Sequence, residues 1–196
     1  MVKLIKQFPA EGWVKSNSVI DEQSLKEISR LQRENEELRG RLEAIAREAP
    51  QGSEKLAQGD DEVELRFDFR ATHKKTWKTY DCSSSLLLSW NELFGCIAPE
   101  MIDECSEVDI ARALVGLVAS YKNIILAKPE FSDLMKASNF VLDRDDFNQI
   151  IVQFRALGLM CLSTKKKNRS TKDTNTYWSL TPYGDFIMTQ LLAIKK

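Results

Sequence analysis

The sequence predicts an α+β protein, mainly α-helical, in which an N-terminal coiled-coil helix precedes a globular domain. Apolar residues repeat with heptad spacing between residues 21 and 47. Residues 63–69 alternate strictly between apolar and polar side chains, which is typical of a half-buried strand. Towards the C-terminus, helical patterns are followed by a glycine, a strand, a basic loop and a second strand. These observations together predict the fold class.

Length and charge narrow the classes of protein to consider. The 196 residues suffice for one medium domain, or for a small domain with an appendage. A formal net charge of -1 excludes an overall basic surface, so any attraction for nucleic acid has to be local. No apolar segment approaches the ~20 residues of a membrane span, and the N-terminus lacks the apolar stretch of a signal peptide. We therefore expect a cytoplasmic protein with no membrane partner.

Side chains that usually carry catalysis or bind metals are few. The cysteines are Cys82, Cys96, Cys105 and Cys161. No two of them have CxxC spacing, so we expect free thiols and no metal site. His73 is the single histidine and lies in the polar stretch 72–75, which indicates a solvated loop. Phosphate-binding glycine loops, HExxH and GxSxG are absent from the sequence. The sequence therefore predicts a non-enzyme without a cofactor.

The chain divides into four segments by composition. Residues 1–20 form a lead-in that is too short to fold alone. Residues 21–47 form the predicted coiled coil. Residues 48–61 are polar, and the phrase Ala-Pro-Gln-Gly-Ser at 49–53 ends the helix, so this segment indicates a linker. Residues 62–196 form the predicted globular domain.

The predicted coiled coil has one polar residue in its apolar seam. The a and d positions are Ile28, Leu31, Asn35, Leu38, Leu42 and Ile45. A buried Asn at an a position is tolerated best in a parallel two-stranded coil, where the two Asn35 side chains bond to each other. Glu34 and Arg39 take g and e positions that attract across a parallel interface. We therefore expect a parallel homodimer; the alternative is a long amphipathic helix lying on its own domain.

The first part of the globular domain combines a strand with helical patterns. The alternation at 63–69 predicts the strand. Ser89 is expected to cap a helix that starts at Trp90. Residues 108–118 carry a second helical pattern, and the apolar spacing at 131–135 suggests a short third helix.

The second part has the order helix, glycine, strand, basic loop, strand. Asp143 or Asp145 begins a helix with one apolar face, and Gly158 ends it. The apolar face comprises Phe147, Ile150, Ile151, Phe154 and Leu157. Residues 159–163 and 175–180 look like two strands joined by a long hairpin loop.

A last helix closes the predicted domain. Thr181 is expected to cap it and Pro182 to take its first position. Its buried residues are expected to be Phe186, Ile187, Leu191 and Leu192. Together with the preceding order, the phrase Trp-Ser-Leu-Thr-Pro-Tyr-Gly at 178–184 looks like the pattern of a winged helix-turn-helix, in which a hairpin wing follows the recognition helix. This similarity covers residues 107–193.

Two surfaces of that pattern are candidates for DNA binding. The wing carries Lys165, Lys166, Lys167, Arg169 and Lys172, five positive charges suited to phosphate contacts. The recognition helix offers Asn148, Gln149 and Arg155 for base edges. Asp145 and Asp146 at its start are expected to be exposed and to repel phosphates. The alternatives are a solvated hairpin tip and a winged helix that binds protein.

The chain also resembles the C-terminal half of a family of bacterial proteins, often encoded near defence or mobile-element genes. Four places carry the resemblance: Gly-Trp-Val at 12–14, the coil at 28–38, Ser-Trp-Asn-Glu-Leu-Phe at 89–94, and the phrase at 178–184. Proteins of that family start with a domain of unknown function that looks like a TIR or nucleoside-deoxyribosyltransferase fold. The resemblance implies that this N-terminal domain is absent here, and it transfers no catalytic residue.

The sequence therefore predicts a non-catalytic dimerisation and recognition module, in which a coiled coil presents paired winged-helix domains to DNA. The alternative is a protein-protein sensor or scaffold module of a bacterial defence or signalling protein, with no nucleic-acid binding.

Overall fold

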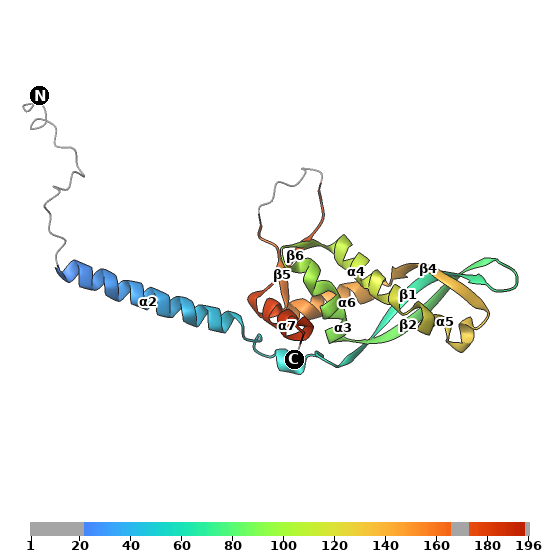
Figure 1. Ribbon diagram of the computed structural model, residues 1–196, viewed down its shortest axis with the longest axis horizontal. Helices are drawn as coiled ribbons and strands as arrows, with labels where there is room; N and C mark the ends of the chain where they lie inside the picture. The colour runs from blue at the N-terminus through green and yellow to red at the C-terminus, as the bar shows by residue number, and fades with distance from the viewer. Residues whose placement is uncertain (1–21, 166–172, 195–196) are drawn as a thin grey trace, which may run out of the picture. The chain divides into compact units, whose positions relative to one another are not determined.

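A computed structural model describes residues 22–165 and 173–194 and divides the chain into two units, Met1–Ile45 and Ala46–Lys196 (Figure 1). Helix α2 (Glu22–Ala46) runs through the described part of the first unit. The second unit combines further helices with two three-stranded antiparallel sheets. The chain is thus mixed α+β with more helix than strand, as the sequence predicts. The lead-in predicted at 1–20 lies outside the described residues.

Helix α2 confirms the helix predicted over 21–47. Ion pairs one turn apart support it: the Arg30 guanidinium lies 2.8 Å from a Glu27 carboxylate oxygen and 3.2 Å from one of Glu34. Glu34, which the sequence pairs with Arg39 of a second copy, therefore already has a partner in its own helix.

The apolar seam of α2 is exposed in the single chain. Its members Ile28, Leu31, Leu38, Leu42 and Ile45 are between 49% and 66% exposed. Asn35 is exposed between them. None of the helices in the described residues combines the length and apolar composition that crossing a bilayer requires.

The first sheet contains β1 (Glu62–His73), β2 (Thr79–Ser89) and β4 (Leu134–Leu142), in the order β2-β1-β4. The predicted alternation on β1 is confirmed, because Leu65, Phe67, Phe69 and Ala71 are at most 2% exposed while their neighbours face solvent. Phe69 stacks on Phe140 of β4 with ring centroids 5.5 Å apart. These rings fill the space beneath the sheet.

Two parts of this sheet differ from the sequence prediction. Residues 131–135 do not form a short helix: η3 (Pro129–Phe131) is a single 3-10 turn, and β4 begins at Leu134. The apolar spacing fits one helical turn, but the free edge of β1 offers a ladder for residues 134–142. Strand β2 is not predicted either, because the serines at 83–85 hide the alternation.

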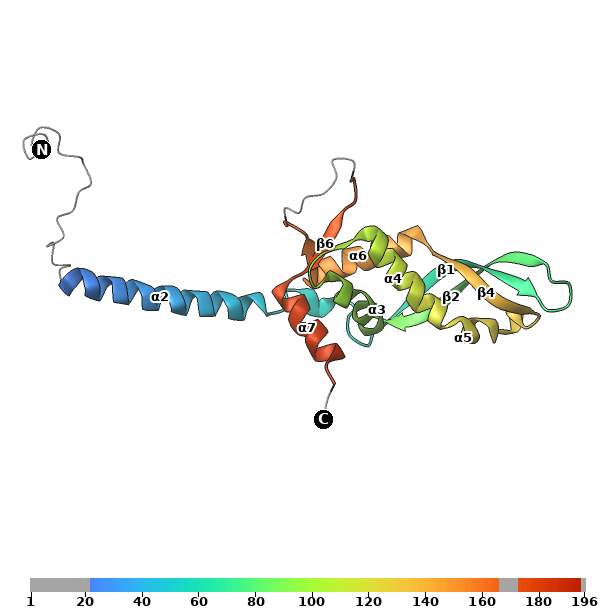
Figure 2. The same ribbon diagram turned by 45° about the horizontal axis from the view of Figure 1, so that its top comes forward.

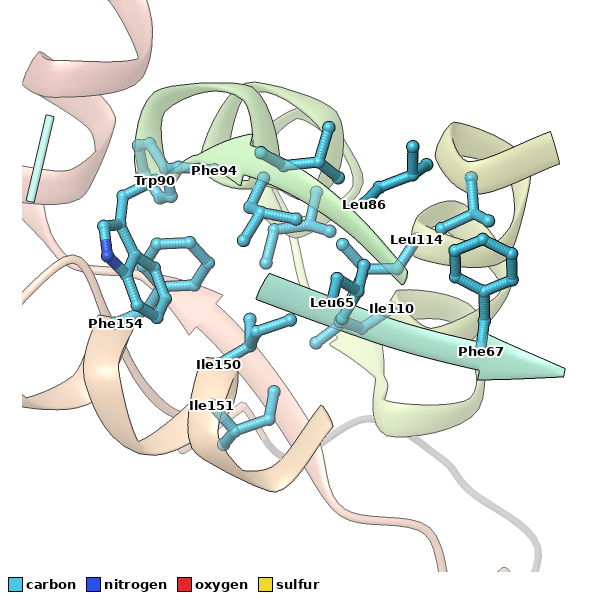
Figure 3. Close-up of a cluster of buried hydrophobic side chains, with 14 of the residues drawn as sticks. Leu65, Phe67, Leu86, Trp90, Phe94, Ile110, Leu114, Ile150, Ile151 and Phe154 are labelled. Atoms are coloured by element: carbon cyan, nitrogen blue, oxygen red, sulfur yellow. The ribbon is translucent and has the colours of Figure 1, made fainter. Parts of the chain in front are cut away.

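Helices α3 (Trp90–Ile97), α4 (Glu107–Ser120) and α6 (Arg144–Ala156) share one hydrophobic core with the first sheet. The Trp90, Phe94 and Phe154 rings meet at one end of it, with Trp90 and Phe154 edge-on and 5.6 Å apart (Figure 3). Leu65, Ile110 and Leu114 lie towards the other end. The shorter elements of the unit are η1 (Ser53–Lys55), η2 (Ala98–Met101) and α5 (Lys122–Leu126).

The second sheet contains β3 (Cys105–Ser106), β5 (Met160–Leu162) and β6 (Tyr177–Leu180), in the order β3-β6-β5. Strands β5 and β6 confirm the two strands predicted at 159–163 and 175–180. Helix α7 (Pro182–Leu192) follows β6. Along the chain, β3 lies between α3 and α4, and α6 comes directly before β5.

Three predicted helix caps are confirmed. Ser89 Oγ accepts the Glu92 N–H at 3.2 Å, and the Glu92 carboxylate accepts the Ser89 N–H at 2.8 Å. This second bond, with one from the Tyr121 hydroxyl, lowers the pKa of Glu92. Asp143 caps α6 and Thr181 caps α7. Gly158, with φ of 69°, ends α6 as predicted.

Helix α7 packs with a narrower face than the sequence predicts. Phe186 and Leu192 are 43% and 47% exposed, so the prediction that they are buried is wrong. Ile187 and Leu191 are half-buried against the core. Helix α7 therefore buries only some of its apolar side chains, because only one of its faces packs against the core.

The residues predicted as a linker make contacts within the second unit. Ser53 is 5% exposed. The Gln153 amide donates to the Ala57 carbonyl at 2.6 Å, and the Trp90 N–H donates to the Asp61 carbonyl at 3.1 Å. The segment 53–61 is therefore packed on α3 and α6.

One ion pair joins α6 to the first sheet. Asp146 of α6 accepts the Arg66 backbone N–H at 2.7 Å and its guanidinium Nη2 at 2.5 Å. The Asp143 N–H returns a bond to the Arg66 carbonyl at 2.9 Å. Asp146 is 7% exposed, and its bond to the Arg66 guanidinium holds its pKa below the usual range against the opposing effect of burial.

Asp146→Asn should reduce the free energy of unfolding by about 1–2 kcal/mol at pH 7, because it removes a charge-assisted bond to a half-exposed partner. The folded pKa of Asp146 lies below the unfolded value of about 3.9, so its contribution is complete above that value and is lost as pH falls through the folded pKa. Urea unfolding at pH 3 and pH 7 tests this. Asp145→Asn, an exposed neighbour, should change little; equal effects of both variants would refute the role of the pair.

Gly184→Ala should destabilise the second unit by roughly 3 kcal/mol, the upper end of the cost of overpacking. A Cβ at Gly184 would overlap the Leu159 backbone carbonyl, which cannot move aside as a flexible side chain does. Gly116→Ala, at an open position of α4, should instead stabilise by about 0.5–1 kcal/mol. Thermal unfolding of both variants measures the two signs, and a neutral Gly184→Ala would contradict the close approach.

Candidate functional site

Helix α6, the predicted recognition helix, exposes one polar face. Asn148 and Gln149 are exposed, and Val152, one helical turn further along the same face, is 62% exposed. On the opposite face Ile150 and Phe154 are almost wholly buried, which fixes the rotation of the helix about its axis. The two predicted base-contacting amides therefore lie on the solvent side of α6.

The start of α6 is less acidic at its surface than the sequence predicts. Asp146 is buried and paired with Arg66, so the prediction that it is exposed is wrong. Asp143 accepts the N–H groups of Asp145 and Asp146 at 3.0 and 3.1 Å. Asp145 is the acidic side chain that remains exposed on this turn, beside the exposed Arg144. Local repulsion of phosphate is therefore weaker than expected.

Arg155 links the end of α6 to the second sheet. Its guanidinium carbon lies 5.2 Å from the centre of the Trp178 ring of β6. Trp178 is buried, and its indole N–H donates to the Glu107 carboxylate at 3.0 Å. The charge predicted to read bases is thus held beside β6 of the β5–β6 hairpin.

The described start of the loop between β5 and β6 is anchored to the residues before β3. The Lys165 ammonium donates to the Asp103 carbonyl at 2.9 Å and also to its carboxylate. Ser163 Oγ donates to the Glu104 carboxylate at 2.6 Å. Lys165, predicted as a phosphate contact, is therefore partly neutralised by an acid. Its predicted companions Lys166, Lys167, Arg169 and Lys172 lie outside the described residues.

All four cysteines are free thiols. Burial raises the pKa of the Cys105 thiol to about 11, and it also raises the pKa of Cys96. Such thiols are weak nucleophiles at neutral pH. Within residues 22–165 and 173–194, no three His, Cys, Asp or Glu side chains are grouped as a metal site would need.

A groove of about 490 Å³ opens on the first sheet. Its lining includes Glu64, Asp68 and Lys128, and neither a histidine nor a cysteine. Serine hydroxyls bond both carboxylates at 2.7 Å, and the Lys128 ammonium donates to the Ser85 carbonyl at 2.7 Å. Glu64, Asp68 and Lys128 therefore each have a hydrogen-bond partner within the fold.

The tip of the β1–β2 hairpin is a surface that the sequence interpretation missed. His73 ends β1 rather than lying in a loop, and its Nδ1 accepts the N–H groups of Lys75 and Thr76 at 3.1 and 3.2 Å. Trp77 beside them is 66% exposed. The signal in the sequence was a tryptophan set between lysines at 74–78.

Comparisons with protein-family models, with curated proteins and with solved structures found no match to this chain.

Proposed function

We propose that this chain is a dimeric recognition module whose second unit is a winged helix-turn-helix that binds duplex DNA through α6 and the β5–β6 hairpin. The observation that carries the proposal is the exposed polar face of α6, a helix that is followed directly by that hairpin. No catalytic step is assigned to it.

The order of elements supports the winged-helix assignment. Helix α3, strand β3 and helix α4 precede α6, and the hairpin β5–β6 follows it. Within the second sheet, the central strand β6 pairs with both β3 and β5. One departure is that α5 and β4 separate α4 from α6, so the two helices of the motif are not joined by a short turn. Strand β4 of this segment pairs with β1, and α6 and the hairpin still follow each other directly in the chain.

The chemistry of α6 supports duplex DNA as the ligand. Amide side chains such as those of Asn148 and Gln149 bond adenine in the major groove. The pairing of Asp146 with Arg66 removes one of the two charges that would oppose phosphate. Arg155 lies at the hairpin end of the same helix, where a positive charge suits the DNA backbone.

The exposed seam of α2 supports the dimer. Five apolar side chains, each about half or more exposed, leave a stripe that is unfavourable in water and that a second copy would cover. With Asn35 in register, a parallel pair brings the two C-terminal ends of α2 to one end of the coil. Two recognition units would then share one target.

A protein partner is the second candidate, and Val152 is the observation that favours it. Its side chain is 62% exposed in the middle of the polar face of α6. An apolar group at that position suits a protein surface, although it also suits a thymine methyl group. Under this alternative the unit is a sensor or scaffold in a bacterial defence or signalling protein.

Duplex DNA binding should be measurable by fluorescence anisotropy and should weaken steeply with salt. Replacing Lys165, Lys166, Lys167 and Arg169 with Ala should reduce the salt slope by up to about 0.9 for each residue that contacts a phosphate. Asn148→Ala with Gln149→Ala should keep the slope but reduce discrimination between sequences.

Lys55→Ala serves as the control, because Lys55 is exposed on η1, outside both surfaces. Binding that is equal in the wild type and in the quadruple variant would rule out the hairpin as a phosphate contact. The absence of salt-dependent binding to duplex DNA would favour the protein partner.

The oligomeric state should be a dimer at micromolar concentration, measured by light scattering after size exclusion. Asn35→Leu should shift the chain towards higher oligomers, since it removes the polar residue that specifies a two-stranded coil. Ser29→Ala, on the same helix but outside the a and d positions, should leave the mass unchanged. A monomeric wild type would contradict the coiled coil.

A further inference from the structure

The tip of the β1–β2 hairpin extends beyond the helices at one end of the second unit, away from β5 and β6 (Figures 1 and 2). Its residues 73–80 read His-Lys-Lys-Thr-Trp-Lys-Thr-Tyr. They contain three lysines and three aromatic or imidazole rings, and no acid. This composition differs sharply from that of a chain whose net charge is -1.

The tip is an ordered turn that exposes its tryptophan. The His73 N–H donates to the Lys78 carbonyl at 2.8 Å, and the Trp77 N–H donates to the His73 carbonyl at 3.0 Å. Trp77 has φ of 59°, a left-handed conformation that is costly for a bulky residue. The turn therefore holds Trp77 in a strained conformation that leaves its side chain 66% exposed, and Tyr80 beside it is 45% exposed.

A lysine from the neighbouring strand completes this surface. The Lys136 ammonium of β4 lies 5.3 Å from the centre of the Trp77 ring. Lys136 also has a left-handed backbone, with φ of 55°. The β1–β2 turn and strand β4 thus both depart from regular geometry where the Trp77 and Lys136 side chains meet, which leaves one face of the indole against a cation.

The positive charge of the tip is largely uncompensated. Among the described residues, neither Lys75 nor Lys78 has an ion-pair partner. Asp81, which follows the tip, is paired with Arg70 at 2.8 Å. The Lys74 ammonium donates to a neutral group, the Ser132 carbonyl, at 2.5 Å.

We propose that this tip binds single-stranded nucleic acid. An unpaired base stacks on the free face of Trp77, and the lysines contact the flanking phosphates. A ring flanked by cations is the arrangement that binds unpaired bases without sequence preference. A duplex keeps the faces of its bases stacked on one another, so the exposed indole favours single strands. This surface is separate from α6 and does not depend on the function proposed there.

An anionic membrane is the competing partner for a basic surface that carries tryptophan. Insertion into the interface requires apolar area that enters the acyl boundary. Residues 73–80 contain no Leu, Ile, Val, Met or Phe, so the apolar area of the tip comes from rings that also carry polar atoms. Stacking on a base uses both the ring face and the lysines, and this favours nucleic acid.

The test is binding of the full chain to a labelled oligothymidylate, followed by anisotropy at several salt concentrations. Trp77→Ala should weaken binding about 5- to 150-fold, the loss expected for one stacked base. Trp77→Phe should retain most of the affinity, because phenylalanine also stacks. Lys75→Ala with Lys78→Ala should weaken binding and reduce the salt slope by about 1.4, at 0.7 per charge.

Two controls separate the tip from other surfaces. Lys55→Ala and the α6 variant Asn148→Ala with Gln149→Ala should bind the oligonucleotide as the wild type does. Oligonucleotide should quench tryptophan fluorescence in the wild type and should quench much less in Trp77→Phe, although that variant still binds. Circular dichroism checks that each variant is folded, since all these side chains are exposed.

Unchanged affinity in folded Trp77→Ala would overturn the proposal. Trp77-dependent binding to vesicles of anionic phospholipid, without binding to the oligonucleotide, would overturn it in favour of a membrane. Weaker binding in Trp77→Ala, together with retention in Trp77→Phe, would support it.

Discussion

The contact between Arg66 and Asp146 holds α6 against the first sheet within the second unit. Arg66 lies on the central strand of the first sheet, and its N–H and carbonyl both bond to the junction where β4 becomes α6. The guanidinium then neutralises a carboxylate that is almost wholly buried. Because α6 leads directly into the second sheet, the position of that sheet also depends on this junction. Removing only the cation would leave a buried charge with fewer partners, which is costly.

The two surfaces proposed for recognition lie in different parts of the second unit. Helix α6 carries one of them and leads directly into the second sheet, and the tip with Trp77 joins β1 to β2 of the first sheet. Both surfaces are ordered by the fold. The buried side of α6 fixes the orientation of its polar face, and the hydrogen bonds that the His73 ring accepts order the turn at the tip. Preorganised groups lose less conformational entropy on binding. The groove on the first sheet, by contrast, has polar groups that already bond to one another.

Much of the local structure follows from the sequence, and the non-local structure does not. Ser89, Asp143 and Thr181 were identifiable as caps, because capping depends on a side chain and the next three residues. Strand β4 was not predicted, and a short helix was expected at 131–135 instead, because the partner strand β1 lies far away in the chain and does not affect the local pattern. The burial of Asp146 was missed for the same reason. At the candidate sites, Asn148 and Gln149 were placed correctly on an exposed face, whereas Trp77 needed the turn geometry to show its exposure.

Strand β1 pairs with one strand that is close in the chain, β2, and with one that is distant, β4. This difference affects the order in which the sheet can form. Strand β2 follows β1 after a short turn, but β4 is made only after α3, α4 and α5. During synthesis β1 therefore passes through a stage in which one of its edges has no partner. An unpaired edge of this kind invites association between nascent chains. The alternating charges of β1, including Glu64, Arg66 and Asp68, are of the type that discourages such pairing. The charged side chains on the surface of the folded sheet would therefore also limit association of β1 before β4 has been made.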